Sequence, residues 1–371
     1  MARTRAPIHP KVTMRKTVIA LLAAVVAAAV LLASCAGIGG FAYYDESKPH
    51  HARDGFRNNH ANWEMPDFWK WQWERTRAGL PRPPRESTPR VEPEAAYLQA
   101  NATEPTLTWL GHATVLLQVG SYNIVTDPHL TERASPVSFY GPKRLTPPGL
   151  DFGQLPHIDI VLISHNHYDH LDLRTVRRLA AQDGGPPLFV VPLGLEKWLR
   201  AQGVGNVVEL DWWDRMGKGS LDIFLVPVQH WSQRTLWDRN QSLWGGFYVR
   251  HRSLSFVFTG DTGYSPDFAD IKKRLGAPDF AAIPIGAYEP RWFMGPQHVD
   301  PGEAVKIHQD LGARHSLGIH WGVFELADES LDEPPRALAE ARAKAGLTPD
   351  QFFVLKVGET RRLADWLREP R

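Results

Sequence analysis

Short apolar runs separated by Gly, Pro or Asp recur along the chain from Thr106 onward. Apolar runs of this kind, when they end at such breakers, are typical of buried strands. We therefore predict strands at residues 107–110, 115–119, 123–126, 158–163, 188–191, 223–228, 247–249, 256–259, 280–283, 317–319 and 352–355.

Apolar residues at helical spacing lie between the later strands and predict helices at residues 171–182, 195–202, 268–275, 302–311 and 335–345. Strands come first along this part of the chain, and strands that alternate with helices follow. This order favours an α/β fold in which helices flank two β-sheets.

The N-terminus has the pattern of a targeting segment. Residues 1–34 contain no acidic side chain, an apolar run covers residues 18–33, and the basic residues before it are Arg3, Arg5, Lys11, Arg15 and Lys16. The following Leu-Ala-Ser-Cys at 32–35 resembles a bacterial lipoprotein signal box. That resemblance implies cleavage before Cys35 and lipidation of its thiol; an uncleaved membrane anchor is the alternative. Either would hold the globular part at a membrane of the bacterial cell envelope, outside the cytoplasm.

Three stretches precede the predicted strands. Residues 36–60 show little periodicity, residues 81–93 are rich in Pro, and residues 63–73 hold Trp63, Phe68, Trp69, Trp71 and Trp73. Because Trp rings favour the lipid–water boundary, the 63–73 segment either meets a membrane or packs on the globular body. We expect a signal peptide over 1–34, a linker and aromatic, Pro-rich extension over 35–105, and one folded domain over 106–371.

Composition excludes some functions. The 371 residues are 43% hydrophobic and 22% charged, as in ordinary soluble domains. The formal net charge is +1 and the leader is purely basic, so the rest of the chain is slightly acidic, which gives no support for nucleic-acid binding. Cys35 is the only cysteine, so an intrachain disulfide and a catalytic thiol in the folded domain are both excluded.

Residues 165–170 read His-Asn-His-Tyr-Asp-His and follow the predicted strand 158–163. Neutral imidazole and carboxylate are good ligands for a borderline divalent cation such as Zn²⁺. His165 and His167 can turn one way from the strand end, while Asp169 and His170 turn the other way into the next helix. Because one cation would not need all four ligands, the segment suggests a centre with two metal ions.

Further candidate ligands follow three other predicted strands. His230 comes after 223–228, Asp261 after 256–259 and His320 after 317–319. Each alone is a weak signal, since a lone His after a strand is more often a hydrogen-bonded loop residue and Gly-Asp-Thr-Gly is often a turn. Together, at the ends of separate strands, they predict one shared rim.

This order of residues resembles the metallo-β-lactamase superfamily, which is marked by H-x-H-x-D-H followed by His, Asp and His at strand ends. The resemblance implies an α/β fold, an αβ/βα four-layer sandwich of two mixed β-sheets flanked by helices, with two Zn²⁺ ions per chain. It also implies one metal held by His165, His167 and His230, a second held by Asp169, His170 and His320, and Asp261 as the bridge between them. Asp127 matches an acidic residue that would orient a ligand; a turn-forming Asp before Pro128 is the alternative.

Longer stretches resemble one family within this superfamily, the phospholipases D that hydrolyse N-acylphosphatidylethanolamine. They are residues 108–114, 141–144, 163–171, 209–213, 283–294, 297–301 and 319–322, and a metal site alone does not demand the stretch 283–294. The leader and the connector 63–93 do not match the animal enzyme closely. The resemblance implies a membrane-tethered, zinc-dependent phospholipase D in which a metal-bridging hydroxide attacks phosphorus, releases N-acylethanolamine and leaves phosphatidic acid.

By the same resemblance, Asp169, Asp261 and His298 are the catalytic candidates, and His298 lies near the scissile phosphate. A structural His that caps the helix starting near Pro301 is the alternative for His298. The candidate substrate contacts are Tyr168, Gln297, Tyr288 and Trp292, for which packing is the alternative.

Two other functions stay open at this point. A lactonase or another phosphodiesterase acting on a soluble substrate would share the superfamily features, because a fold does not fix a function. A non-catalytic lipoprotein is disfavoured by the complete ligand set. The expected partners are a phospholipid substrate and a membrane, without nucleic acid, and a homodimer is compatible with the Trp-rich segment but not required.

Overall fold

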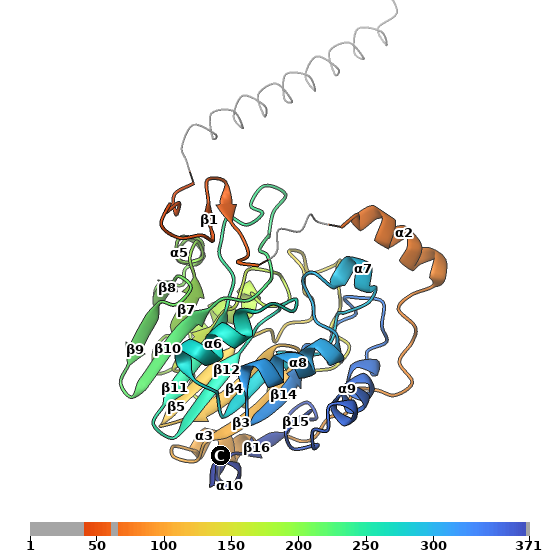
Figure 1. The fold of residues 1–371 in the computed structure, drawn as a ribbon. Helices are drawn as coiled ribbons and strands as arrows, with labels where there is room; N and C mark the ends of the chain where they lie inside the picture. Colours follow the sequence, from red (N-terminus) through yellow and green to blue (C-terminus); the bar gives the residue numbers. More distant parts are fainter. Residues whose placement is uncertain (1–40, 61–65, 369–371) are drawn as a thin grey trace, which may run out of the picture.

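Two β-sheets of seven strands each pack face to face in the computed structural model, which describes residues 41–60 and 66–368 (Figure 1). The first sheet has the strand order β16-β3-β4-β5-β6-β7-β8 and the second the order β15-β14-β13-β12-β11-β10-β9. The first sheet consists of β3 (Thr106–Gly111), β4 (Thr114–Val119), β5 (Tyr122–Thr126), β6 (Ile160–Leu162), β7 (Leu188–Pro192), β8 (Val207–Leu210) and β16 (Thr360–Arg362). The second consists of β9 (Arg215–Lys218), β10 (Leu221–Val226), β11 (Gly246–His251), β12 (Leu254–Phe258), β13 (Phe280–Pro284), β14 (His315–Ile319) and β15 (Phe352–Phe353).

Each sheet combines an antiparallel part with a parallel part. β3, β4 and β5 pair antiparallel, whereas β5 to β8 pair parallel. In the second sheet β9 to β12 pair antiparallel and β12 to β15 pair parallel. β3 and β5 therefore run in the direction of β6, and β10 runs in the direction of β12 and β14. Within each sheet, the carboxyl ends of these strands lie on one edge, and the predicted ligands follow them there.

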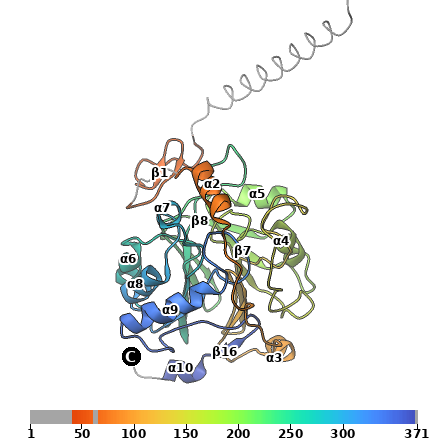
Figure 2. The same ribbon diagram turned by 90° about the vertical axis from the view of Figure 1, so that its right-hand side faces the viewer.

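Helices cover the outer faces of both sheets (Figure 2). α3 (Ala95–Ala100), α4 (Leu173–Ala180) and α5 (Glu196–Ala201) pack on the first sheet, and α6 (Asp267–Leu275), α8 (Pro301–Leu311) and α9 (Glu333–Lys344) pack on the second. Two shorter helices are α7 (Arg291–Met294) and α10 (Ala364–Arg368). The predicted four-layer sandwich of two mixed sheets is confirmed.

The apolar runs arise because most strands are buried on both faces. In β4, Val115 and Leu117 face the core between the sheets, and Leu116 faces the outer helices. Side chains alternate along a strand, so a strand that is covered on both sides must be apolar throughout. The sequence missed β8, β9 and β16, which all lie at sheet edges, where polar and charged residues are tolerated.

Residues 41–60 have the composition of a linker, but they fold onto the body. β1 (His51–Ala52) and β2 (Gly55–Phe56) form a small hairpin. The Phe56 N–H donates to the Asn240 carbonyl at 2.8 Å, and the buried Phe56 ring packs against Phe41 and belongs to the main hydrophobic cluster. The linker prediction therefore fails here, because tertiary contacts order a segment that has no periodic pattern of its own.

The Trp-rich segment forms α2 (Phe68–Ala78), which lies beside α7 (Figure 1). Trp71 stacks on Phe293 with ring centroids 4.5 Å apart, while Trp69 and Trp73 are exposed. The helix therefore packs on the folded body through Trp71 and exposes the rings of Trp69 and Trp73 to solvent. The leader with Cys35, and Trp63, lie outside the described residues. In the described part of the chain, no helix combines the length and the apolar character that crossing a bilayer needs.

Candidate metal centre

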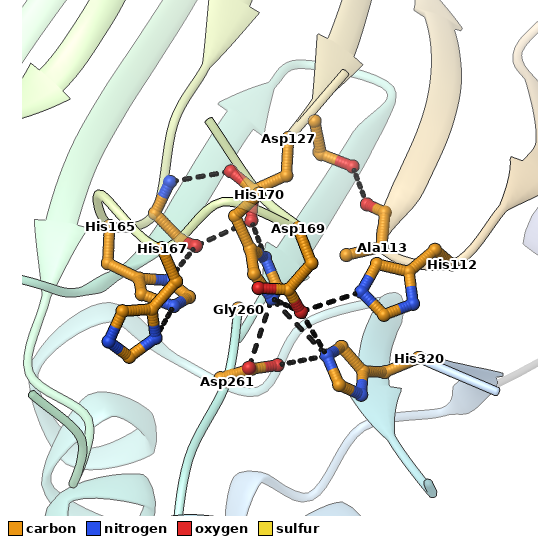
Figure 3. Close-up of polar contacts among 12 residues, drawn as sticks. His112, Ala113, Asp127, His165, His167, Asp169, His170, Gly260, Asp261 and His320 are labelled. Atoms are coloured by element: carbon orange, nitrogen blue, oxygen red, sulfur yellow. Dashed lines mark hydrogen bonds and ion pairs between the residues drawn. The ribbon is translucent and has the colours of Figure 1, made fainter. Parts of the chain in front are cut away.

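Strand ends from both sheets bring the candidate ligands together (Figure 3). The segment 165–170 follows β6, and Asp127 follows β5 in the same sheet. His230, Asp261 and His320 follow β10, β12 and β14 of the second sheet. The side chains meet at the seam between the two sheets, and most of them are buried.

The first cluster consists of His165, His167 and His230. His165 Nε2 lies 2.8 Å from His167 Nδ1, which lies 3.3 Å from His230 Nε2. All three nitrogens lie within 4.8 Å of one another. Zn–N bonds are about 2.0–2.1 Å long, so three nitrogens at such separations suit a single cation.

The second cluster is joined to the first by Asp261. Asp169 Oδ2 lies 3.2 Å from His170 Nε2 and 3.3 Å from His320 Nε2. Asp261 Oδ2 lies 3.0 Å from His170 and 3.9 Å from His230, and its Oδ1 lies 3.2 Å from His320. The structure thus brings all the predicted ligands together, with Asp261 facing both clusters. That they bind metal stays a prediction.

Asp127 orients two of these ligands (Figure 3). The Ser164 N–H and Oγ–H donate to Asp127 Oδ1 and Oδ2 at 2.7 and 2.5 Å, and His170 Nδ1–H donates to Oδ2 at 2.6 Å. Because the Ser164 hydroxyl proton points to Asp127, its oxygen accepts from His165 Nδ1–H at 2.9 Å. His165 and His170 therefore both turn Nε2 toward the centre, as metal-binding histidines do.

Gly260 leaves room for Ser164 in this position. Its φ is +60°, and a Cβ there would lie 2.5 Å from Ser164 Cβ. A larger residue would push Ser164 away from both Asp127 and His165. Gly260, which follows β12 of the second sheet, therefore leaves the space that the candidate ligands after β6 of the first sheet require.

His230 is held from two sides. Its Nδ1–H donates to the Gln297 carbonyl at 2.9 Å, so that its Nε2 faces His167. Asn58 of the N-terminal segment accepts from the His230 N–H at 3.0 Å and donates to the His230 carbonyl at 2.9 Å. A residue that precedes the predicted folded domain thus helps to place a ligand.

His298 lies beside Asp261, with its Nδ1 3.8 Å from Asp261 Oδ2 and its side chain 13% exposed. Arg291 donates to the His298 carbonyl at 2.9 Å and pairs with Glu303 of α8 at 2.7 Å. Asp300 is the N-cap of α8, because its side chain accepts from the Glu303 N–H. The capping alternative for His298 is therefore wrong, and its ring remains available to a substrate.

His112 belongs to the second cluster, although it was not among the predicted site residues. Its Nε2–H donates to Asp169 Oδ2 at 3.0 Å. Its carbonyl accepts from the Trp109 indole N–H at 2.9 Å and from the His320 N–H at 3.0 Å. The available signal was its position after the predicted strand 107–110, since β3 ends on the same edge as β5 and β6.

Comparison with known proteins places this arrangement in a family. A sequence model of the family described as a beta-lactamase superfamily domain matches residues 122–321, more than half of the chain. The chain belongs to the metallo-β-lactamase superfamily. It is a hydrolase of that fold, and the matched region contains all seven of its candidate metal ligands.

Two similar proteins carry the same name. N-acyl-phosphatidylethanolamine-hydrolyzing phospholipase D 1 of Caenorhabditis elegans is 44% identical over 265 residues, which cover 68% of this chain and 74% of that protein. The mitochondrial yeast protein of that activity, from Saccharomyces cerevisiae, is 38% identical over 260 residues, 68% of this chain and 55% of that protein. A solved structure from Veillonella parvula, titled a possible metal-dependent hydrolase, matches 70% of this chain and 100% of that chain with a TM-score of 0.57 and 15% identity, a likeness of fold.

The superfamily implies metal ions, and the donor set of this hydrolase fits them. Buried atoms that have no hydrogen-bond partner within the described residues gather at the centre, among them Asp261 Oδ1, His298 Nδ1 and His167 Nε2. The Nε2 lone pairs of His165 and His230 both face His167 Nδ1, so that three imidazole nitrogens converge on one place where a cation would fit. Zinc suits such an imidazole and carboxylate set.

The two clusters differ in charge when no cation is bound. Burial lowers the pKa of His167 and of His230 to about 3, so these rings are neutral at pH 7. Burial also acts to lower the pKa of His320, but the Asp261 and Asp169 carboxylates outweigh it and raise that pKa to about 9. Burial acts to raise the pKa of Asp169, yet His170 holds it well below its usual value. The second cluster therefore holds protons that the first lacks.

The candidate substrate contacts are not all brought to the centre. Tyr168 donates its hydroxyl to the Arg234 carbonyl at 2.8 Å and lines a cavity of about 330 Å³. Gln297 is buried, and its backbone carbonyl accepts the hydrogen bond from His230 Nδ1–H. Trp292 is partly exposed on α7, with Lys70 over its ring at 4.7 Å. Tyr288 is buried and donates its hydroxyl to Glu333 of α9 at 2.9 Å, a packing role.

Asp127→Asn should weaken metal binding about 10–100-fold, because an amide cannot accept all the bonds that orient His170 and, through Ser164, His165. A competing chelator measures the affinity. Asp279→Asn is the matched control, since Asp279 accepts from Ser255 N–H and Oγ–H at 2.9 and 2.8 Å in the same carboxylate–serine unit. Equal affinities in the two variants would contradict the orienting role.

Metal binding to the second cluster should strengthen as the pH rises toward 9, because a proton must leave His320 before a cation binds. Binding to the first cluster should be independent of pH above 5, since the pKa of His167 and His230 is about 3. Calorimetric titration in buffers of different ionisation enthalpy counts the protons released. Equal proton release for both ions would refute this difference.

Proposed function

We propose that this enzyme is a membrane-tethered, zinc-dependent phospholipase D that hydrolyses N-acylphosphatidylethanolamine-type phospholipids to N-acylethanolamine and phosphatidic acid. The observation that carries the proposal is the pair of ligand clusters joined by Asp261, in a chain 44% identical to a protein named for this activity. The stretch 283–294 runs from the end of β13 through α7 and precedes His298. Its resemblance to the lipid-hydrolysing family supports the lipid reaction over others of the superfamily.

The protein's own residues have distinct tasks in this reaction. Two divalent cations, when bound, would supply an acidified water as nucleophile and polarise the phosphoryl oxygens. Asp261 faces both clusters and would fix their relative position. Burial lowers the pKa of His298 to about 3, so the ring is neutral at pH 7. A neutral ring can donate a hydrogen bond to the phosphate or to the leaving oxygen of the N-acylethanolamine.

The cavity beside Tyr168 suits a phosphorylated lipid by its charge. Its lining includes Arg133, Arg174, Arg177 and Arg234 and two acidic residues, Glu132 and Asp172, so that the positive charges outnumber the negative ones. The Arg234 guanidinium lies 4.1 Å from the centroid of the Tyr168 ring, and Tyr168 belongs to the candidate ligand segment 165–170. An excess of cationic side chains in a cavity attracts an anionic phosphodiester and orients it. The cavity adjoins the candidate centre through Tyr168, and none of the candidate ligands lines it.

Exposed apolar residues around this cavity support a lipid surface as the source of substrate. The loop that holds Phe139 and Tyr140 borders one side, and the loop with Leu236 and Trp237 borders the other; these side chains are 76–86% exposed. A separate set of exposed rings lies on α2, next to α7 and away from the lining of this cavity. Clusters of exposed large apolar side chains near one opening are typical of interaction sites and of membrane interfaces.

The tether is proposed from the leader alone. Lipidated Cys35 would hold the folded part within reach of a bilayer, and mass spectrometry of the mature N-terminus tests this. A diacylated Cys35 is the expected result. An N-terminus that begins at Met1 would refute the lipoprotein form.

Product analysis tests the reaction itself. Zinc-loaded enzyme is mixed with vesicles that contain N-acylphosphatidylethanolamine, phosphatidylethanolamine and phosphatidylcholine, and the products are identified by mass spectrometry. We expect N-acylethanolamine and phosphatidic acid in equal amounts. Diacylglycerol would show cleavage of the other phosphoester bond, and turnover of soluble lactones without lipid turnover would favour the alternative function.

Two variants assign this activity to the centre. Asp261→Ala should abolish turnover, because it removes the group shared by both clusters, and His298→Gln should lower kcat about 10²-fold. His157→Gln, which alters an exposed histidine bound to the Asp183 carbonyl, is the control with unchanged activity. Full activity in both site variants would place the reaction elsewhere.

A further inference from the structure

A second group of metal-binding side chains lies outside the centre, where the N-terminal hairpin meets the end of β8. His50 Nε2 lies 2.6 Å from Asp211 Oδ1, and His51 Nε2 lies 3.0 Å from Asp211 Oδ2. All three residues are buried, and the three ligand atoms lie within 4.8 Å of one another. None of them takes part in the clusters joined by Asp261.

The hydrogen bonds around His51 decide what its Nε2 can offer to a cation. His51 Nδ1 lies 2.6 Å from the Tyr43 carbonyl, which can only accept, so this nitrogen donates. In a neutral ring, Nε2 then presents a lone pair to the carboxylate oxygen of Asp211. Two lone pairs that face each other across 3.0 Å repel, so this contact needs a positive charge, which a proton on the ring, the Lys48 ammonium or a bound cation can supply.

The rings are also fixed in direction. His50 stacks on Trp212 with centroids 4.5 Å apart, and its ring stands nearly perpendicular to that of His51. The Trp212 N–H donates to Asp211 Oδ1 at 2.7 Å. Two imidazoles and a carboxylate that point at one place from rigid surroundings form a donor set that suits Zn²⁺ or a similar borderline cation.

A cation already reaches this place. Lys48 Nζ contacts Asp211 Oδ2, and the Lys48 side chain is 38% exposed on a flexible stem, so it can withdraw into solvent. The ammonium occupies the side of the carboxylate that a divalent ion would take. It therefore competes with such an ion rather than completing its coordination.

We propose that His50, His51 and Asp211 bind a structural divalent cation, such as Zn²⁺, that is distinct from the ions of the catalytic centre. The site fastens the N-terminal hairpin to the end of β8. The same segment carries Asn58, whose side chain makes both backbone bonds to His230. The ion thereby stabilises the segment that holds a ligand of the catalytic centre.

Counting bound zinc tests the site without any substrate. Wild-type enzyme and variants are equilibrated with excess Zn²⁺, dialysed against metal-free buffer and measured by mass spectrometry of the metal. We expect His51→Gln to hold one zinc fewer per chain than wild type, and the control His157→Gln to equal wild type. The difference between variants decides, so the result does not depend on the number of ions at the catalytic centre or on its reaction.

Lys48→Met provides a second test that does not remove a ligand. It should keep the wild-type count and retain the additional zinc at several-fold lower free zinc, because the competing ammonium is gone. Zinc should also slow tryptic cleavage within residues 48–57 in wild type, but not in His51→Gln. Equal zinc counts in wild type and a folded His51→Gln overturn the proposal. If His51→Gln fails to fold, an unchanged zinc affinity in Lys48→Met overturns it.

Discussion

The buried carboxylate of Asp127 makes the interactions on which the candidate metal centre depends. It is fully enclosed, and burial raises its pKa, so its charge is costly unless it is well bonded. Two donors of Ser164 and the His170 imidazole supply those bonds. Through them, one side chain at the end of β5 fixes the start of the ligand segment after β6. One candidate ligand of each cluster, His165 and His170, is therefore oriented by Asp127, His165 through Ser164 and His170 directly.

Much of the centre could be predicted because its information is local. The ligands after β6 stand in one short segment, and His230, Asp261 and His320 each follow an apolar run, so strand direction alone brings them to one rim. Most strands could be predicted for the same reason, because strands covered on both faces are apolar throughout and appear in the sequence as apolar runs. Edge strands such as β9 were not predicted, because their exposed positions allow polar residues and leave no apolar run.

The remaining features depend on contacts between distant parts of the chain. His112 resembles an ordinary hairpin residue until its neighbours across the seam are known. The segment 41–60 has no pattern that predicts a fold, and its order comes from partners such as Asn240 and His230. Tyr288 shows the opposite case: its place in a family-like stretch suggested a substrate contact, whereas its hydroxyl binds Glu333. Such side chains are assigned by what surrounds them in space, which a linear pattern does not contain.

His112, Asp127 and His320 all have positive φ values, of 54°, 32° and 63°. Such backbone is unfavourable for residues other than Gly, and it persists only where the surroundings enforce it. The enforcing contacts are protein contacts: the His320 N–H binds the His112 carbonyl, and the Cβ of any residue replacing Gly286 would collide with the His320 carbonyl. The backbone at these three positions is thus set by contacts within the chain. The directions in which these side chains leave the chain at the seam therefore depend on residues such as Gly286 that offer no ligand atom themselves.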